Sequence, residues 1–227
     1  MMAQKRRRIT NLILIGVLIL GVILFLVLQK WQALGLSGTA VLAILGLMRV
    51  LPELIDNPIK RRIKAERRAD RGAAAEEVVG DILADLGEDF YVLNDISSPY
   101  GNIDHIVIGK DRGVFLLETK AHRGKVEVTD DQLLVNGKLP EKNFIAQALK
   151  NAYWLRDEIE KMTGSKVWIT PVVVFTNAFV QAGKPIRGVY TVNKKYLPNL
   201  LQRQARPSAG LAQLWDAKQE LADQLMT

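Results

Sequence analysis

The chain has 227 residues and no cysteine, which excludes disulfides, thiolate metal sites and a cysteine nucleophile. Only two histidines occur, His105 and His122, so a histidine-rich zinc site is not expected. The net charge of +7 is concentrated at one end: residues 1–71 carry 13 Lys and Arg against 4 Asp and Glu, a balance of +9, whereas residues 72–227 carry 18 against 20, a balance of −2. The overall charge therefore does not support nucleic-acid binding by the body of the chain.

The basic N-terminus, residues 1–10, is followed by two apolar runs that predict a hairpin of membrane-spanning helices over residues 11–50. The first run, Asn11–Leu28, has 18 uncharged residues, near the lower limit for crossing about 30 Å of hydrocarbon as a helix. The second run is Ala33–Met48. The alternative is a cleaved signal peptide, but its apolar core has about 7–15 residues and a small-residue cleavage site follows it, which this sequence lacks.

Basic residues predict the orientation of this hairpin. Four precede the first run, only Lys30 lies between the two runs, and seven occur in Lys60–Arg71. The positive-inside rule therefore predicts a multi-pass protein of the inner, cytoplasmic membrane, with both termini and the body of the chain in the cytoplasm. Residues 51–71 form a basic connector that Pro52 and Pro58 are expected to interrupt. Its basic run either contacts anionic lipid headgroups or only sets the topology.

The rest of the chain predicts alternating helices and strands. A first helix is expected over residues 74–86 because its apolar residues recur at helical spacing. The expected strands are Phe90–Ile96, Ile103–Ile108, Val114–Lys120, Lys125–Val128, Gln132–Val135, Val167–Phe175 and Gly188–Val192. The further expected helices are Asn143–Met162, Lys194–Arg203 and Ala209–Met226. This alternation predicts an α/β domain at residues 72–192, with helices on both faces of a sheet, followed by C-terminal helices at residues 193–227.

Three side chains that could take part in catalysis lie on the two strands that flank the turn at Gly109–Gly113. Asp104 is in the first strand, and Glu118 and Lys120 share one face of the second because they are two residues apart. Two carboxylates and a lysine that converge at strand ends suit a divalent cation acting on a phosphodiester. The alternative is that Glu118 and Lys120 form a surface ion pair worth about 0–1 kcal/mol and that Asp104 is solvated near a turn.

Five segments carry a resemblance to a known family. They are Gly72-x-x-Ala75-Glu76-x-x-Val79, Asn102-Ile103-Asp104-His105-Ile106-Val107, Gly113-Val114-Phe115-x-x-Glu118-Thr119-Lys120, Gly124-Lys125-Val126 and Asn143-x-x-x-Gln147-x-x-x-Asn151. Over roughly residues 72–180 the sequence resembles the NERD (nuclease-related) domain, which is placed in the PD-(D/E)XK nuclease superfamily. The resemblance implies a restriction-endonuclease-like mixed sheet flanked by helices.

The resemblance also implies a role for each of five residues. Asp104 and Glu118 would bind the metal ion, Mg²⁺ or Mn²⁺, and Glu76 would be a further carboxylate at the metal site. Lys120 would orient the attacking water or stabilise developing charge on the phosphate. Gln147, on a helix, would face the site and position substrate or water.

The two histidines have weaker assignments. His105 alternates away from Asp104 along the strand, which favours a packing or hydrogen-bonding role over a ligand role. His122 and Arg123 lie just past the expected strand end. Contact with phosphate and a position in a solvated loop are equally compatible with that location.

The sequence therefore predicts a membrane-anchored, magnesium-dependent nuclease that cleaves phosphodiester bonds in DNA, or alternatively in RNA, on the cytoplasmic side. The alternative is a catalytically silent, membrane-tethered module that binds nucleic acid or protein. The nearly neutral body favours that alternative, because nucleases usually present a basic track to phosphate. A third hypothesis is that the hairpin forms homo-oligomers and clusters the domains.

Overall fold

The computed structural model describes residues 16, 18–19, 21–23, 26, 38–129, 131–181, 183–203 and 208–226. The chain divides into two compact units, Met1–Lys64 and Ala65–Thr227. Of the predicted hairpin over residues 11–50, residues 11–15, 17, 20, 24–25 and 27–37 lie outside the described residues, so the run Asn11–Leu28 is described only in part. Within the described ranges, no helix contains an apolar stretch that is long enough to cross a bilayer.

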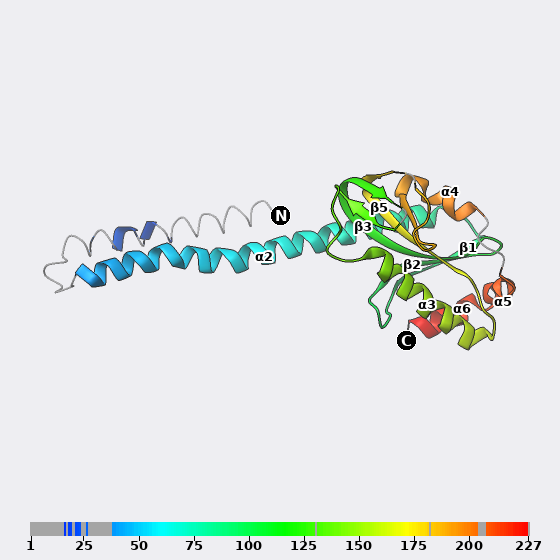
Figure 1. Ribbon diagram of the computed structural model, residues 1–227. Helices are drawn as coiled ribbons and strands as arrows, with labels where there is room; N and C mark the ends of the chain where they lie inside the picture. Colours follow the sequence, from blue (N-terminus) through cyan, green and yellow to red (C-terminus); the bar gives the residue numbers. More distant parts are fainter. Residues whose placement is uncertain are drawn as a thin grey trace. The chain divides into compact units, whose positions relative to one another are not determined.

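A single helix, α2, runs from Gly38 to Ala84 (Figure 1). The expected interruptions at Pro52 and Pro58, and the expected start of a separate helix at residue 74 after Gly72, are wrong because the backbone stays helical through all these positions. An interior proline costs about 3 kcal/mol and a glycine about 1 kcal/mol, but both penalties are local. The surrounding Ala, Leu, Glu, Lys and Arg residues favour a helix strongly enough to continue it.

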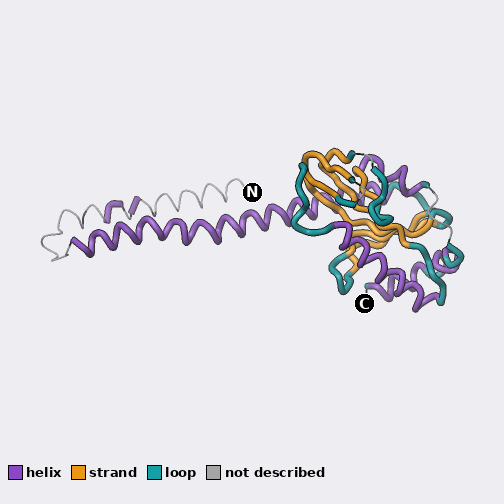
Figure 2. The backbone as a smooth tube through the Cα atoms, viewed as in Figure 1, coloured by secondary structure: helices purple, strands orange, loops and turns teal. Residues whose placement is uncertain are grey.

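The unit Ala65–Thr227 is built on a six-stranded mixed sheet, drawn as the orange layer in Figure 2. The strands are β1 (Phe90–Ile96), β2 (Ile103–Gly109), β3 (Gly113–Val128), β4 (Leu133–Val135), β5 (Ile169–Val180) and β6 (Tyr190–Asn193). Their order is β1-β2-β3-β5-β6, with β4 paired to β3. The first three are antiparallel to one another, while β5 and β6 continue parallel to β3. The predicted α/β class is therefore confirmed.

Strand β3 combines the two separate strands that the sequence predicts at Val114–Lys120 and Lys125–Val128. Its register against β5 shifts between Lys120 and Arg123, which marks a bulge. Gly124 follows with φ of 97°, and a Cβ at this position would lie 2.0 Å from the Asn136 side-chain oxygen. Only glycine tolerates that backbone and that approach. Bulges redirect side chains, and this one comes directly after Lys120.

Helices cover both faces of the sheet (Figure 1). One face packs on α3 (Phe144–Thr163), α5 (Leu211–Asp216) and α6 (Lys218–Leu225), and the other packs on the C-terminal part of α2 and on α4 (Leu197–Gln202). The first core contains Ile106, Leu116, Leu155, Leu214 and Leu221. The second contains Val79, Leu83, Val107, Leu197 and Leu201. The C-terminal helices, including the short η1 (Lys194–Tyr196) before α4, are thus part of the same folded unit.

Helix α3 begins with a side-chain cap. The Asn143 side-chain oxygen accepts a hydrogen bond from the Ala146 N–H at 3.0 Å. The helix ends at Gly164, whose φ is 70° and whose N–H donates to the Glu160 carbonyl at 2.8 Å. Asparagine at this position satisfies an N–H that has no partner within the helix.

Asn143→Ala is therefore expected to lower the free energy of unfolding by about 1 kcal/mol. Urea unfolding followed by tryptophan fluorescence reports this, since Trp154 packs against the core. Asn143→Ser, which keeps a capping oxygen, is the matched control and should lose much less. Equal losses in both variants would show that the cap does not stabilise α3.

Candidate active site

Apolar packing on the α3 face of the sheet is divided into two clusters, and polar residues occupy the level between them. Along β3, Leu116 belongs to one cluster and Val126 to the other. Glu118 and Lys120 come between them on the same face, since residues two apart in a strand share a face. On α3, Phe144 belongs to the cluster of Val126.

Asp104 and Glu118 lie opposite each other on neighbouring antiparallel strands. The register of β2 and β3 pairs His105 with Leu117, so the next pair outward is Asp104 with Glu118. The backbone N–H of Thr119 donates a hydrogen bond to Oδ2 of Asp104. This bond fixes the Asp104 carboxyl group against β3, beside Glu118.

The surroundings of Asp104 disfavour its negative charge. Burial is the largest cause, and the charge of Glu118 adds to it, so that the pKa of Asp104 rises from 3.8 to about 7. The Thr119 N–H and the charge of Lys120 act in the opposite direction, and Glu76 makes a small raising contribution. The negative charges of Asp104, Glu118 and Glu76 therefore exceed the positive charge that Lys120 supplies at the site.

Glu118 and Lys120 form a buried ion pair. The Glu118 side chain is 3% exposed and that of Lys120 is 16% exposed, so the alternative of a surface pair is wrong. Lys120 Nζ contacts Oε1 of Glu118 and lies 4.9 Å from the centroid of the Phe144 ring. The second carboxylate oxygen of Glu118, Oε2, is buried and has no hydrogen-bond partner in the described part of the chain. A buried carboxylate oxygen without a partner is costly unless a further positive group binds it.

These residues fit a divalent cation. Mg²⁺ is usually bound through one or two carboxylates, with water and substrate phosphate completing its coordination. Asp104 and Glu118 supply two carboxylates, and Oε2 of Glu118 lacks a partner. Among the described residues, no three Asp, Glu or His side chains converge into a metal-binding group. Glu76 is exposed, and its charge makes only a small contribution to raising the pKa of Asp104.

The geometry agrees with the result of a comparison with protein families. Residues 71–176 match NERD, the nuclease-related domain. The match covers Glu76, Asp104, Glu118, Lys120 and Gln147. Comparisons with curated proteins and with solved structures gave no match. The matched residues include the sheet from β1 into β5, whereas α4, α5 and α6 lie C-terminal to them.

Helix α3 places Gln147 one turn after Phe144. Residues three and four apart share a helix face, so Gln147 lies on the stripe that includes Phe144 and Asn151. Gln147 is half-buried, and its side-chain amide forms no hydrogen bond with any residue that the structure describes. Asn151 is fully buried and accepts a hydrogen bond from the Ser98 hydroxyl at 2.8 Å, which joins α3 to the turn between β1 and β2.

His105 points to the opposite face of the NERD sheet. It is 4% exposed, and its Nδ1 lies 2.8 Å from the Asn94 side-chain oxygen. Burial lowers its pKa to about 4, so the ring is neutral, although the nearby backbone carbonyl of Glu76 acts in the other direction. The packing and hydrogen-bonding role favoured by the sequence is confirmed.

His122 lines the lysine side of the site. Its ring centroid lies 5.3 Å from that of Phe144 and 6.2 Å from that of Phe175. Burial lowers the pKa of His122, and the positive charges of Lys120, Arg68 and Arg71 lower it further. His122 is therefore part of β3 rather than of a solvated loop.

Sequence reasoning missed several contributors to this site. They are the Thr119 N–H, the Phe144 ring, and two arginines of α2, Arg68 and Arg71. A signal existed only for the arginines, which are three residues apart and therefore share a helix face.

Proposed function

We propose that the NERD domain is a metal-dependent nuclease that cleaves phosphodiester bonds, with DNA as the expected substrate and Mg²⁺ or Mn²⁺ as its cofactor. The observation that carries the proposal is the carboxylate pair of half-buried Asp104 and buried Glu118, in which one Glu118 oxygen has no partner and Lys120 lies alongside. The family match supports the same chemical class. The mixed sheet supports the finer assignment to a restriction-endonuclease-like fold.

The residues of the chain have distinct tasks in this proposal. Asp104 and Glu118 would hold the cation, which supplies positive charge that polarises the phosphate ester and acidifies water. Lys120 donates hydrogen bonds to a phosphate oxygen and offsets the charge that develops in the transition state. Glu76 raises the affinity for cations through its charge near Asp104. Gln147, whose amide is unpaired, positions substrate or water.

The buried surroundings of Lys120 strengthen its electrostatic interaction with phosphate. With its side chain 16% exposed and the Phe144 ring 4.9 Å away, its ammonium group is less screened by water than an exposed lysine would be. A cation held by Glu118 would compete with Lys120 for the same carboxylate, so the ammonium group would lose its strongest partner. It is then available to the phosphate.

We also propose that the domain is held at the cytoplasmic face of the inner membrane by residues 11–50, with the basic run Lys60–Arg71 near anionic headgroups and self-association of the hairpin as a further property. The apolar runs and the distribution of basic residues support this. Protease protection of the full chain in sealed inverted vesicles tests the orientation. Digestion of the domain from the outside of such vesicles is expected, and complete protection would contradict it.

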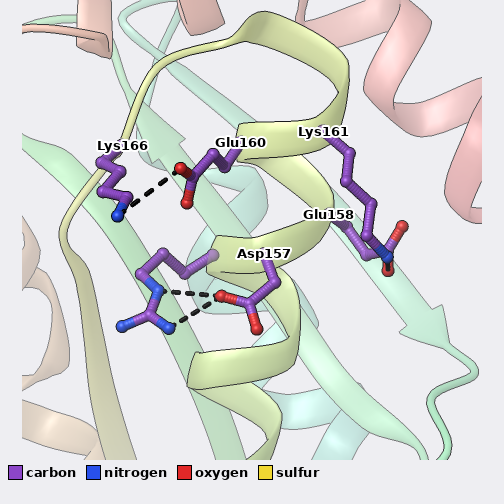
Figure 3. Close-up of polar contacts among 6 residues, drawn as sticks. Asp157, Glu158, Glu160, Lys161 and Lys166 are labelled. Carbon is purple, nitrogen blue, oxygen red and sulfur yellow. Dashed lines mark hydrogen bonds and ion pairs between the residues drawn. The ribbon is translucent and has the colours of Figure 1, made fainter.

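The nuclease proposal is tested with the full chain purified in detergent. It should cleave labelled DNA or RNA with Mg²⁺ or Mn²⁺ and stop when EDTA is added. Asp104→Ala and Lys120→Ala should each abolish cleavage. Lys161→Ala is the matched control, because it removes a lysine from an exposed ion pair with Glu158, 2.7 Å away on α3 (Figure 3). Unchanged cleavage in both site variants would disprove the site assignment.

The second candidate function is a silent module that binds nucleic acid or protein. The balance of −2 over residues 72–227 is the observation that favours it. Binding that persists in EDTA, with no cleavage of single-stranded or double-stranded substrates by the wild-type chain, would establish this alternative over the nuclease.

A further inference from the structure

The C-terminal part of α2 brings basic residues to the candidate active site. Arg68 and Arg71 belong to the unit Ala65–Thr227. Arg68 Nη1 lies 3.8 Å from Oε2 of Glu141, in the segment that leads into α3. Three residues later, the Phe144 ring contacts both Lys120 and His122. A short path of contacts therefore connects α2 to the lysine of the site.

The positive charges of Arg68 and Arg71 act on His122, a residue of the site. After burial and the charge of Lys120, Arg68 and Arg71 are the next causes that lower the pKa of His122. Glu141 acts in the opposite direction but more weakly. The side of the site that carries His122 is thus electropositive, although residues 72–227 as a whole are not.

The guanidinium group of Arg71 is not paired with a carboxylate among the described residues. Its Nε donates to the backbone carbonyl of Arg67 at 2.9 Å, and it forms no ion pair with any residue in the described ranges. Two of the three basic residues of α3 differ, because Arg156 pairs with Asp157 at 2.7 Å and Lys161 pairs with Glu158 (Figure 3), while Lys150 lies over the Tyr100 ring. The positive charges that act on His122 are those of Lys120, Arg68 and Arg71, so α2 is the basic helix beside the site.

We propose that Arg68 and Arg71 bind the phosphate backbone of nucleic acid that enters the candidate active site, so that this segment of α2 is part of the substrate-binding surface. The inference rests on the proposed function. Guanidinium groups bind phosphate through paired, charge-assisted hydrogen bonds. The two arginines are three residues apart and so point to the same side of the helix.

This assignment divides the basic run Lys60–Arg71 at the boundary between the two compact units. Lys60–Lys64 belongs to the first unit and remains the candidate for lipid headgroups. Arg68 and Arg71 belong to the second unit, which contains the site. The basic track that a nuclease needs is then supplied from outside residues 72–227, which accounts for the near neutrality of that region.

Glu141 acts as a competitor in this arrangement. Its carboxylate is 85% exposed and lies on the guanidinium group that would bind phosphate. An exposed pair of this kind is weak, so a phosphodiester displaces it easily. Glu141→Ala should therefore tighten nucleic-acid binding, by about threefold.

The test measures binding of a fluorescein-labelled DNA duplex to the full chain in detergent with EDTA, by fluorescence anisotropy at a series of NaCl concentrations. The double variant Arg68→Ala/Arg71→Ala should bind more weakly. The slope of log K against log salt should fall in magnitude by about 1.8, since each lost phosphate contact removes about 0.9. Arg68→Lys/Arg71→Lys should keep the wild-type slope, which separates lost charge from misfolding.

Arg62→Ala/Lys64→Ala is the matched control on the same helix, and it should leave DNA binding unchanged. Wild-type affinity and slope in Arg68→Ala/Arg71→Ala would overturn the inference. So would a loss of binding to phosphatidylglycerol vesicles with DNA binding intact, since these arginines would then be a lipid contact. If the wild-type chain binds DNA with these slopes but does not cleave it with Mg²⁺, the inference stands and the nuclease proposal fails.

Discussion

Asp104→Asn is expected to stabilise the metal-free protein at neutral and alkaline pH while abolishing cleavage. In the folded protein the pKa of Asp104 is about 7, whereas its ordinary value is 3.8. Between these two values the folded state keeps a proton that the unfolded state has lost. The free energy of unfolding therefore falls as the pH rises through this window, and the loss is complete above about pH 7.

The size of this effect follows from the shift. Three pKa units correspond to about 4 kcal/mol, which is the largest gain that a neutral replacement can give at about pH 8. Asparagine keeps an oxygen that can accept the Thr119 N–H, so the local hydrogen bond survives. At about pH 4 both the folded wild-type and the variant are uncharged here, and the gain should vanish.

Guanidinium chloride unfolding in EDTA at the two pH values measures this prediction. Asp157→Asn is the control, because this exposed carboxylate pairs with Arg156 on the surface of α3 and should show little pH-dependent gain. If Asp104→Asn is less stable than wild type at alkaline pH, the site does not hold the excess negative charge described above. A gain in stability with a loss of activity is the pattern expected where a site is organised to bind a cation.

Lys120→Met is expected to destabilise the metal-free protein by about 3–5 kcal/mol, because it leaves the Glu118 carboxylate buried without its partner. Methionine has a similar length and fills most of the space beside Phe144. The double variant Glu118→Gln/Lys120→Met removes both charges and should recover most of the lost stability, since a neutral pair has no unpaired charge to bury. Both variants should lose cleavage by at least about two to three orders of magnitude.

A cation should also offset the loss in Lys120→Met. Mn²⁺ that binds the folded protein at Glu118 stabilises it by mass action, so the deficit of the single variant should shrink as Mn²⁺ is added. The double variant should respond much less, because a glutamine replaces the Glu118 carboxylate. Equal stability of the single and double variants in EDTA would show that Glu118 is not a charged, buried partner of Lys120.

Local sequence patterns were sufficient for most of the sheet. The strand Phe90–Ile96 was predicted with the bounds that it has, because turn residues flank it on both sides. The face shared by Glu118 and Lys120 followed from strand alternation alone. Their pairing with Asp104 needed only a hairpin turn at Gly109–Gly113, which the glycines indicated. The two carboxylates of the site were thus accessible from sequence.

Features that depend on contacts between residues far apart in the chain could not be predicted from the sequence. Whether Glu118 is buried depends on α3, which returns over the sheet before β5 and has no local link to β3. The same crossover brings Phe144 to Lys120. The continuity of α2 was missed because Pro52, Pro58 and Gly72 are local signals against a helix, and the summed preference of a long flanking sequence outweighed them.

The position of Arg68 shows this limit most clearly. The distribution of charge along the chain places Arg68 in a membrane connector, because the sequence does not show what the C-terminal part of α2 packs against. The contact with Glu141 places it next to α3 instead. Charge composition by segment therefore described the basic run correctly but could not show that Arg68 contacts Glu141 in the segment before α3.

The most direct test is a crystal of the wild-type protein soaked with Mn²⁺ and measured for anomalous scattering. An anomalous peak is expected between Asp104 and Glu118, about 2.0–2.3 Å from an oxygen of each carboxylate, with Lys120 moved away from Glu118. Glu118→Gln crystals soaked in the same way should lack the peak. Saturating Mn²⁺ without a peak at these carboxylates, in a protein that cleaves nucleic acid, would contradict the proposed site.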